Sequence, residues 1–307
     1  MEQDKPHVLI ACDYPDSVYD VNSTAIINGL KGRYYFTKIY TCDLPIIDHR
    51  SFDLVYCMWW RSDFLDRNFI PRDKLCIQVA SFWSWQRNFP TPLEELVEKY
   101  LLRAGAVSVN CYGLWEVISP LHPHVFLNRG GVDLELFKPC PPRSTDKPLV
   151  VGWTGSVTTH GNNKGYYDII LPACSAVTDV MLNTRTKEER VFAHKDMPQF
   201  YSEIDVYVCA SESEGTPCPV LEAAASARAV ISTPVGIVPD LIQDWDNGLV
   251  IGRSVEDLTR AIVQLRDDRQ LCLKMGQRNR EKVISDGWSW KERAQAYGYM
   301  FDMMLAL

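Results

Sequence analysis

The stretch "IDVYVCASESEGTPCPVLEAAASARAVISTP", residues 204–234, contains two apolar runs separated by a polar loop and an alanine-rich segment. The runs 204–211 and 228–234 have the length and β-branched content of strands that are buried on both faces. Pro219 suits the first turn of a helix, and the small alanines suit close packing of that helix on a sheet. A strand, a helix and a second strand in this order form a parallel unit with a right-handed crossover. The stretch therefore predicts an α/β fold.

The same alternation extends over the whole chain of 307 residues, a length that suggests two domains. The strands predicted in the first half are 7–13, 34–40, 52–59, 75–81 and 106–111, and those predicted in the second half are 148–155, 204–211, 228–234 and 247–252. A proline-rich stretch, "KPCPPRSTDKP" at 138–148, lies between the halves and is typical of a stiff linker. We therefore expect an N-terminal Rossmann-like domain over residues 1–140 and a C-terminal one over residues 145–290.

Helices are predicted between these strands by their caps and their apolar faces. Thr91 followed by Pro92 is typical of a helix start, and Ser254 marks another. The helices predicted in the second half are 165–176, 219–227, 254–267 and 269–285. A last helix begins at Ser289, after the second domain is already complete. We expect its residues 293–307 to pack back on the N-terminal domain.

The composition is that of a globular protein with an acidic balance. The net charge of −7 argues against a surface that binds nucleic acid, although it leaves room for a local basic cleft. The 10 cysteines form no C-x-x-C pair and several lie in apolar runs, so we interpret them as reduced thiols of a cytoplasmic protein. No apolar run has the length of a membrane span, and the acidic start does not fit a secretory signal.

Two glutamates, Glu214 and Glu222, stand eight residues apart around the helix start at Pro219. The loop with Glu214 follows a strand, so we expect it at the carboxyl edge of the sheet, where open α/β folds bind ligands. The N–H groups of a helix start favour an anion. In one interpretation the two carboxylates are ordinary charges, of which Glu214 is solvated and Glu222 is stabilised by the helix dipole. In the other, they accept hydrogen bonds from hydroxyls at both ends of a bound diphosphate. The spacing alone leaves both interpretations open.

A longer tract, residues 197–251, resembles the retaining glycosyltransferases of family four, the "group 1" glycosyltransferases of GT-B fold. Their hallmark E-x7-E is matched by Glu214 and Glu222, within the motifs "EGTP" and "LEA". The resemblance extends to residues 130–139 and 287–297, and it covers about two thirds of the chain. It implies two facing, doubly wound, Rossmann-like domains with an interdomain cleft, and it favours the second interpretation of the glutamates.

The resemblance also implies a role for each matched residue. Glu222 matches a glutamate that holds the ribose hydroxyls of the donor, and Glu214 matches one that contacts hydroxyls of the transferred sugar. Lys164 matches a lysine that stabilises the charge of the departing diphosphate, so Glu214 and Lys164 are the expected catalytic residues. The other expected donor-binding residues are Gly155, Ser156, Gly215, Thr216, Pro217, Cys218, Val220 and Leu221.

The donor side departs from the family pattern at one position. The family usually has an arginine directly after the glycine turn of the second domain's first strand, and this sequence has Ser156 there. Of the two positive side chains that the resemblance implies at the diphosphate, an arginine and a lysine, only Lys164 is therefore present. Arg87 and Arg185 are candidate substitutes, and a hydroxyl with turn amides is another.

The first domain departs further, because it lacks a histidine that contacts the sugar at a later strand end in the family. Tyr14, Ser81 and Trp83 occupy the positions where contacts to the acceptor or the sugar are expected. For the tryptophans of "WSW", at 83–85, core or lid packing is the alternative to an acceptor platform.

These matches predict a metal-independent glycosyltransferase that moves a hexose from a nucleotide-diphosphate sugar to a hydroxyl, with retention at the anomeric carbon. A UDP-sugar is the expected donor, GDP- and ADP-sugars are alternatives, and no prosthetic group is expected. The expected acceptor is a glycan, a lipid carrier, a metabolite or a hydroxylated base in DNA. Two other functions stay open, namely a nucleotide-sugar epimerase of the same fold and a degenerate transferase that acts as a binding protein.

Other patterns are interpreted as structural. "DWD", at 244–246, matches the D-x-D of metal-dependent glycosyltransferases, but it lies in a loop, so we expect a surface turn. "HPH", at 122–124, has no cysteine or carboxylate nearby, and no metal site is expected. His160 and His194 lie on the donor side by chain order alone.

Overall fold

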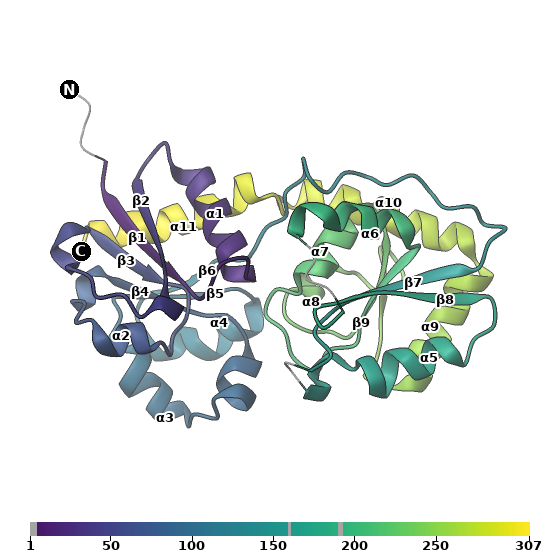
Figure 1. Ribbon diagram of the computed structural model, residues 1–307, viewed down its shortest axis with the longest axis horizontal. Helices are drawn as coiled ribbons and strands as arrows, with labels where there is room; N and C mark the ends of the chain where they lie inside the picture. The colour runs from purple at the N-terminus through teal and green to yellow at the C-terminus, as the bar shows by residue number, and fades with distance from the viewer. Residues whose placement is uncertain (1–4, 159–160, 190–192) are drawn as a thin grey trace. The chain divides into compact units, whose positions relative to one another are not determined.

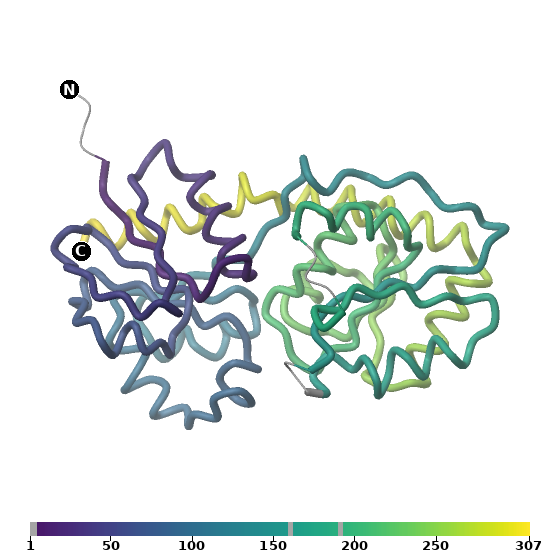
Figure 2. Tube along the Cα trace, in the orientation of Figure 1, coloured from purple at the N-terminus to yellow at the C-terminus, as the bar shows by residue number. Residues whose placement is uncertain are grey.

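The chain folds into two compact units, each built on a parallel β-sheet. The computed structural model describes residues 5–158, 161–189 and 193–307 (Figure 1). Unit 1 comprises Met1–Gly131 together with Trp290–Leu307, and unit 2 comprises Val132–Ser289. The chain thus enters unit 2 after Gly131 and returns to unit 1 at Trp290, as the trace in Figure 2 shows.

Unit 1 contains a six-stranded sheet with the strand order β2-β1-β3-β4-β5-β6, in which all neighbours are parallel. Its strands are β1 (His7–Cys12), β2 (Tyr35–Tyr40), β3 (Leu54–Cys57), β4 (Leu75–Val79), β5 (Ala106–Val109) and β6 (Val125–Leu127). Its α-helices are α1 (Val18–Leu30), α2 (Asp63–Arg67), α3 (Leu93–Glu95), α4 (Tyr112–Ile118) and α11 (Trp290–Leu305). The parallel order puts the carboxyl ends of β1, β3, β4 and β5 on one edge of the sheet.

Unit 2 contains a five-stranded parallel sheet with the order β11-β10-β9-β7-β8. Its strands are β7 (Leu149–Gly155), β8 (Val180–Thr186), β9 (Val206–Cys209), β10 (Ala229–Ser232) and β11 (Leu249–Val250). Its α-helices are α5 (Leu171–Ser175), α6 (Met197–Glu203), α7 (Cys218–Ala225), α8 (Val238–Leu241), α9 (Val255–Asp267) and α10 (Arg269–Ser285). The predicted unit of strand, helix and parallel strand corresponds to β9, α7 and β10.

The last helix, α11, packs on α1 within unit 1 (Figure 1). Arg33, just after α1, forms an ion pair with Asp302 of α11. The hydroxyl of Tyr34 donates to the backbone oxygen of Gly298 at 3.0 Å. Phe301 of α11 is fully buried, and its ring packs edge-on against Tyr34. The C-terminal helix therefore completes the core of unit 1.

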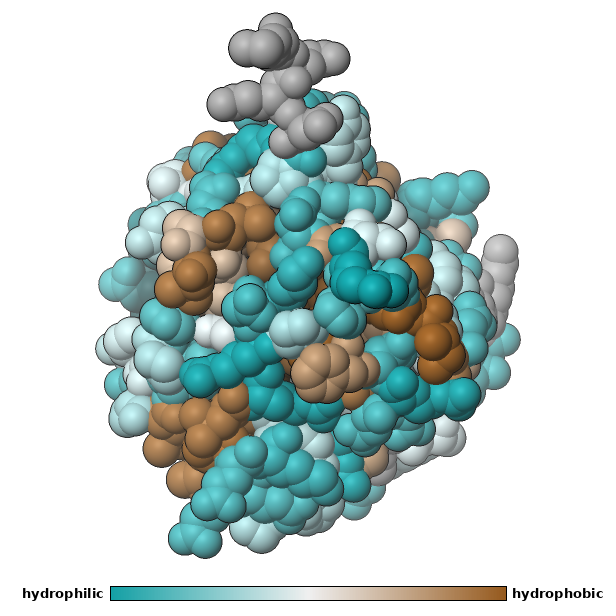
Figure 3. All heavy atoms as spheres, turned by 90° about the vertical axis from the view of Figure 1, so that its left-hand side faces the viewer, coloured by the Kyte–Doolittle hydropathy of each residue, from teal (hydrophilic) through white to brown (hydrophobic). Residues whose placement is uncertain are grey.

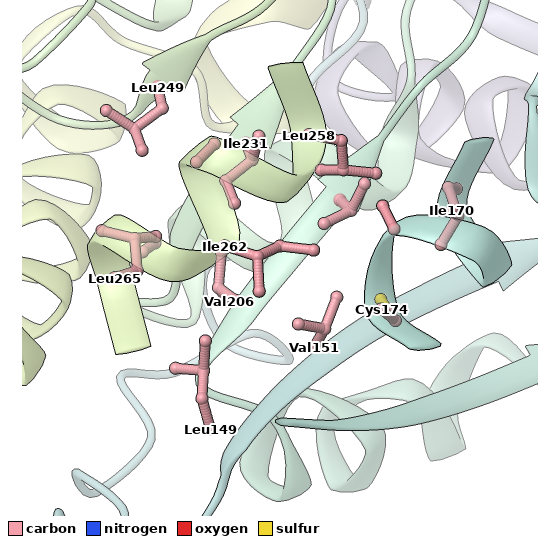
Figure 4. Close-up of a cluster of buried hydrophobic side chains, with 14 of the residues drawn as sticks. Leu149, Val151, Ile170, Cys174, Val206, Ile231, Leu249, Leu258, Ile262 and Leu265 are labelled. Atoms are coloured by element: carbon pink, nitrogen blue, oxygen red, sulfur yellow. The ribbon is translucent and has the colours of Figure 1, made fainter. Parts of the chain in front are cut away.

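The core of unit 2 lies between its sheet and its helices. Val151 and Val206 of paired strands pack in one cluster with Ile262 and Leu265 of α9 (Figure 4). These four side chains are fully buried. Burying a side chain of this size contributes about 1.5–3 kcal/mol relative to leaving it exposed. Such a core fixes the positions of the strands, and therefore of their carboxyl ends, where the loops begin.

The proline-rich stretch 138–148 lies within unit 2. Arg228 donates to the backbone oxygen of Pro141 at 2.9 Å, and Arg269 donates to that of Lys147 at 3.4 Å. The stretch therefore runs along unit 2 with its carbonyl groups bound to arginines.

The two helix starts singled out in the sequence have different outcomes. Ser254 is the N-cap of α9, and its hydroxyl accepts from the N–H of Asp257 at 3.0 Å, as predicted. The predicted cap at Thr91 is wrong, because Pro92 precedes the first helical residue and no side chain caps it. The Thr91 hydroxyl instead donates to the backbone oxygen of Phe89 at 2.8 Å.

The surface is mixed in character. On the face of the molecule shown in Figure 3, hydrophobic residues form separate patches among hydrophilic ones. Within the described residues, no helix combines the length and the apolar composition that a membrane crossing requires.

Candidate active site

The candidate site lies at the carboxyl edge of the unit 2 sheet, where β9 leads into α7 through the loop 210–217. The 3-10 turn Gly161–Lys164 lies against this loop. The side chain of Asn163 donates to the backbone oxygen of Ser213 at 3.1 Å and accepts from its N–H at 3.0 Å. These reciprocal bonds place Lys164 beside the loop, although the two segments are about 50 residues apart in the sequence.

Lys164 and Glu214 form an ion pair. The Lys164 Nζ lies 2.5 Å from the Glu214 Oε1, and the two side chains are only 23% and 14% exposed. The hydroxyl of Ser211 donates to the same carboxylate oxygen at 2.7 Å. Burial lowers the pKa of Lys164, but the attraction of the Glu214 carboxylate outweighs it and raises the pKa above its ordinary value. The ammonium group therefore stays charged at neutral pH.

Glu222 is 7% exposed and lies in α7, at the other end of the loop and helix start. The hydroxyl of Tyr201 donates to its Oε2 at 2.7 Å, and the Nε2 of His194 lies 3.0 Å from its Oε1. Tyr201 belongs to α6, and His194 lies in the turn just before α6. The carboxylate is therefore satisfied inside the protein by a hydroxyl and a ring N–H, and the hydroxyls of a sugar or ribose are donors to a carboxylate in the same way as that of Tyr201.

The contact between His194 and Glu222 predicts a pH-dependent contribution to stability. The hydrogen bond to Glu222 raises the pKa of His194 above its ordinary value, against the opposing effect of burial. Protonated His194 therefore stabilises the folded state. This contribution is complete below the unfolded pKa of about 6.5 and is lost as the pH rises through the folded pKa.

We accordingly expect His194→Asn to lower the Tm at about pH 5.5 and to have little effect at about pH 8.5. Thermal unfolding of both proteins at several pH values checks this. In the Glu222→Gln background the pH dependence of the His194→Asn effect should become much smaller, because only the weaker attraction of Asp133 still raises the pKa of His194. An effect that grows with rising pH would contradict the assigned direction of the pKa shift.

The loop 210–217 presents main-chain N–H groups ahead of α7. Pro217 and Pro219 have no N–H, and the N–H groups of Val220 and Leu221 donate to the Pro217 oxygen at 2.9 and 3.5 Å. The amides that precede these helical bonds are those of Gly215, Thr216 and Cys218. Among the expected donor-binding residues of this segment, Gly215, Thr216 and Cys218 are therefore the ones whose main-chain N–H groups precede the helical bonds.

The side chains of this segment differ in what they can contribute. The hydroxyl oxygen of Thr216 is buried and has no hydrogen-bond partner within the described residues. Buried polar atoms generally have a partner, so this hydroxyl is a candidate contact for a ligand. Burial raises the pKa of the Cys218 thiol to about 12, so it is not a thiolate nucleophile at neutral pH. The side chains of Val220 and Leu221 lie in the core.

Gly236 allows the turn after β10 to contact the backbone of the loop 210–217. Gly236, in the turn after β10, has φ +54°, and a Cβ there would lie 2.0 Å from the backbone oxygen of Gly215. The N–H of Ile237 donates to the same oxygen at 3.0 Å. Only a residue without a side chain allows this close approach of the two backbones.

Gly236→Ala is therefore expected to destabilise the protein. The left-handed backbone alone costs an alanine about 1–2 kcal/mol, and the clash with Gly215 adds to it. Thermal unfolding should show a Tm lower by about 2–8 °C. Gly32→Ala is the matched control, because a Cβ at Gly32 would meet nothing within 4 Å. Equal Tm values for the two variants would show that Gly236 does not constrain the loop.

Ser156 lies in the turn after β7, where a carboxylate from a neighbouring turn contacts it. Its hydroxyl donates to Glu188 Oε1 at 2.6 Å. The N–H groups of Val157 and Thr158 donate to the same oxygen at 3.1 Å. Gly155, the last residue of β7, is paired with Thr186 of β8, which places the two turns side by side.

The residues predicted for the acceptor side belong to unit 1. Tyr14 follows β1 and is 51% exposed. Ser81 follows β4, and its hydroxyl accepts from a backbone N–H three residues later at 3.2 Å. Trp83 is half-buried at the start of a π-helical segment. Trp85 is buried and donates to the backbone oxygen of Thr91 at 2.9 Å, so the second tryptophan of "WSW" packs in the core.

The patterns that were interpreted as structural have protein partners. Asp244 accepts from a backbone N–H at 2.8 Å, and Asp246 pairs with Arg278 at 2.6 Å, both in the turn before β11. Both ring nitrogens of His122 contact backbone oxygens at 3.1 Å. Within the described residues, no group of three or more His, Cys, Asp or Glu side chains could hold a metal ion. His160 lies outside the described residues.

The segment that holds Glu214 and Glu222 matches a known family. Residues 190–282 match the model of the glycosyl transferases group 1. The group 1 match covers β9, α7 and β10, and therefore the loop described above, whereas Lys164 and the Ser156 turn lie outside it.

Two curated relatives of the chain are mannosyltransferases. The lipopolysaccharide core biosynthesis mannosyltransferase LpcC of Rhizobium leguminosarum bv. viciae is 28% identical over 217 residues, which is 60% of each chain. A GDP-mannose-dependent phosphatidylinositol monomannoside mannosyltransferase of Mycobacterium tuberculosis is 31% identical over 106 residues. That alignment covers 32% of this chain and 27% of the relative. The chain thus spans about 60% or less of the length of these relatives.

Solved structures resemble the chain over nearly its full length. Sucrose-phosphate synthase from Thermosynechococcus elongatus has a TM-score of 0.77 at 14% identity, with 98% of this chain and all of that chain covered. HepE from Anabaena, in complex with UDP and glucose, has a TM-score of 0.73 at 12% identity, with 97% and 99% covered. The chain has a GT-B fold. The fold class predicted from the sequence is therefore confirmed.

Several residues of the candidate site, among them Tyr201, Glu188 and Arg253, were not anticipated from the sequence. Tyr201 reaches Glu222 from α6, and Glu188 reaches the turn after β7. Arg253, just after β11, donates to the backbone oxygens of Ala210 and Asn162 and so ties the loop to the turn with Lys164. Arg185, a proposed substitute for the missing arginine, pairs with Glu203 at 2.6 Å. No sequence motif marks these contacts, because each joins segments that are distant in the chain.

Proposed function

We propose that the protein is a retaining glycosyltransferase that moves a hexose from a nucleoside-diphosphate sugar to a hydroxyl group. One observation carries the proposal. A buried carboxylate, Glu222, and a charged pair, Lys164–Glu214, stand at opposite ends of one loop and helix start. That loop lies in the segment that matches the glycosyl transferases group 1.

Glu222 holds the ribose of the donor. Its two oxygens already accept from Tyr201 and His194, so vicinal hydroxyls can take the same acceptor sites or share them. A hydrogen bond to a charged acceptor is worth about 1.5–3 kcal/mol, which makes this carboxylate the main anchor of the nucleoside.

The diphosphate lies between the carboxylates, against the N–H groups of the loop and the ammonium of Lys164. The ammonium has three N–H donors, so it can keep its bond to Glu214 and still donate to a phosphate oxygen. The Thr216 hydroxyl and the amides of Gly215 and Cys218 supply further donors. Glu214 then contacts hydroxyls of the sugar that is transferred.

The transfer follows from this arrangement. The bond between the anomeric carbon and the diphosphate oxygen breaks, and its electrons go to the diphosphate, where Lys164 stabilises the new charge. The acceptor oxygen forms its bond to the anomeric carbon on the same face. Its proton passes to the departing phosphate oxygen. Attack from the face of the leaving group gives retention, as the resemblance to family four implies.

The donor is proposed to be a nucleotide-diphosphate hexose. The solved structure of HepE contains UDP and glucose, and the mycobacterial relative is named for GDP-mannose. A UDP-sugar and GDP-mannose are therefore the first donors to test. The acceptor carries a hydroxyl on a glycan or lipid, as the names of the two relatives suggest, and Tyr14, Ser81 and Trp83 of unit 1 are proposed to contact it.

A thermal-shift panel of nucleotide-sugars tests the proposal. A ligand at 100 times its dissociation constant stabilises the folded state by about 2.7 kcal/mol, which gives a clear rise in Tm. We expect one nucleotide class to raise the Tm, and the matching sugar nucleotide to be consumed when an acceptor is added. Formation of a different sugar nucleotide without an acceptor would instead indicate an epimerase. No shift with any nucleotide or nucleotide-sugar would overturn the proposal.

A further inference from the structure

The turn after β7 surrounds a carboxylate with donors from the protein. We call residues 156–158 the Ser156 turn. Glu188, which follows β8, accepts from the Ser156 hydroxyl at 2.6 Å and from the Thr158 hydroxyl at 2.7 Å. The N–H groups of Val157 and Thr158 donate to it at 3.1 Å. Four donors from three consecutive residues therefore converge on one side chain.

These donors make the Ser156 turn a site for a negative charge. The hydrogen bonds from Ser156 and then Thr158 lower the pKa of Glu188 to about 2, so the carboxylate is ionised throughout the physiological range. Ser156 is 4% exposed, so its hydroxyl is held in place, whereas Glu188 is exposed to solvent. Consecutive N–H groups and hydroxyls of this kind bind phosphate oxygens as well as carboxylates.

The Ser156 turn lies on the sheet edge that carries the proposed donor site. β7 is the direct neighbour of β9, and Ser156 and the loop 210–217 follow these two strands at their carboxyl ends. Ligands of open parallel sheets bind at this edge. An anion that reaches this edge can therefore meet the Ser156 turn.

We propose that Glu188 occupies the Ser156 turn, which is a predicted part of the donor site, until the donor's diphosphate takes its place. This inference rests on the proposed function. The exposed Glu188 side chain can rotate into water, so its release requires no change in the core. The incoming diphosphate carries more charge than one carboxylate and takes over the same donors. Glu188 thus acts as an internal competitor of the donor.

Titration with inorganic pyrophosphate tests the inference without a nucleoside. A site that is free for only a fraction of the time binds with its affinity reduced by that fraction, so an occupant present about 90% of the time weakens binding about tenfold. We expect Glu188→Ala and Glu188→Gln to bind pyrophosphate about 5–10 times more tightly than the natural protein. Ser156→Ala should bind it more weakly.

Glu189→Gln is the matched control. Glu189 is the next residue in the chain, its side chain is also exposed, and the substitution removes the same charge. It should change the affinity less than about twofold. If Glu189→Gln raised the pyrophosphate affinity equally, the gain would come from the change in net charge alone, and the inference would be overturned. Weaker pyrophosphate binding by Glu188→Ala, with a lower Tm, would also overturn it, because Glu188 would then only support the turn.

Failure of this inference and failure of the proposed function are distinguishable. If the Glu188 variants bind pyrophosphate like the natural protein while Glu222→Gln loses nucleotide binding, the proposed donor site is supported and the competition by Glu188 at the Ser156 turn is overturned. If the Glu188 variants gain pyrophosphate affinity but no nucleotide-sugar binds, the Ser156 turn is an anion site and the assignment of its occupant as a donor diphosphate is overturned.

Discussion

Lys164→Met is expected to lower the rate constant of sugar transfer by about 10²–10³, with a smaller change in the affinity for the donor. The ammonium contacts the diphosphate most strongly when the bond to the sugar breaks and the charge on the leaving group grows. Asn163 holds its segment against the loop 210–217, and Glu214 raises its pKa against the opposing effect of burial. Single-turnover kinetics with saturating donor measure this step directly.

Two further variants separate chemistry from stability. Removing Lys164 leaves Glu214 largely buried without its cationic partner, which destabilises the fold. The double variant Lys164→Met/Glu214→Gln removes that charge, so its Tm should recover while its transfer rate stays low. Lys282→Met is the control, because Lys282 pairs with Asp286 at 2.7 Å on α10 of the same unit. A Lys164→Met protein with the natural transfer rate would remove Lys164 from the mechanism.

Glu222→Gln is expected to weaken nucleotide binding by about 10–100-fold, because it replaces a charged acceptor of ribose hydroxyls by a neutral one. The variant keeps the shape of the side chain and one oxygen for Tyr201. Isothermal titration with the nucleotide that raises the Tm most in the ligand panel measures the change.

Glu203→Gln is the matched control for Glu222→Gln. Glu203 also lies in unit 2 and pairs with Arg185 at 2.6 Å, but it is the last residue of α6 and lies outside the loop 210–217 and α7. Its nucleotide affinity should stay within about twofold of the natural protein. Equal losses in both variants would mean that Glu222 supports the fold rather than the ligand.

The sequence predicts the fold well because each unit is built from local signals. The apolar runs around 206–209 and 229–232, with Pro219 at the helix start between them, correspond to β9, β10 and α7. The failed prediction at Thr91 is equally local in origin. Its hydroxyl has a nearer acceptor in the carbonyl of Phe89, so the cap that the pattern suggests does not form.

The candidate site is only partly predictable from the sequence. Glu214 and Glu222 are marked by their motif, but the ion pair of Glu214 with Lys164 joins residues that lie in different segments. The contact of Glu188 with the Ser156 turn depends on the pairing of β7 with β8. Contacts of this kind depend on the sheet order, which no local pattern encodes.

The structure of the complex with UDP or GDP, whichever binds, tests the central claim most directly. The account predicts that both ribose hydroxyls lie within about 3.2 Å of the Glu222 carboxylate and that the diphosphate contacts the Lys164 ammonium. It also predicts that the amides of Gly215, Thr216 and Cys218 face the phosphates. A nucleotide bound away from α7, with Glu222 still held by Tyr201 and His194 alone, would contradict it.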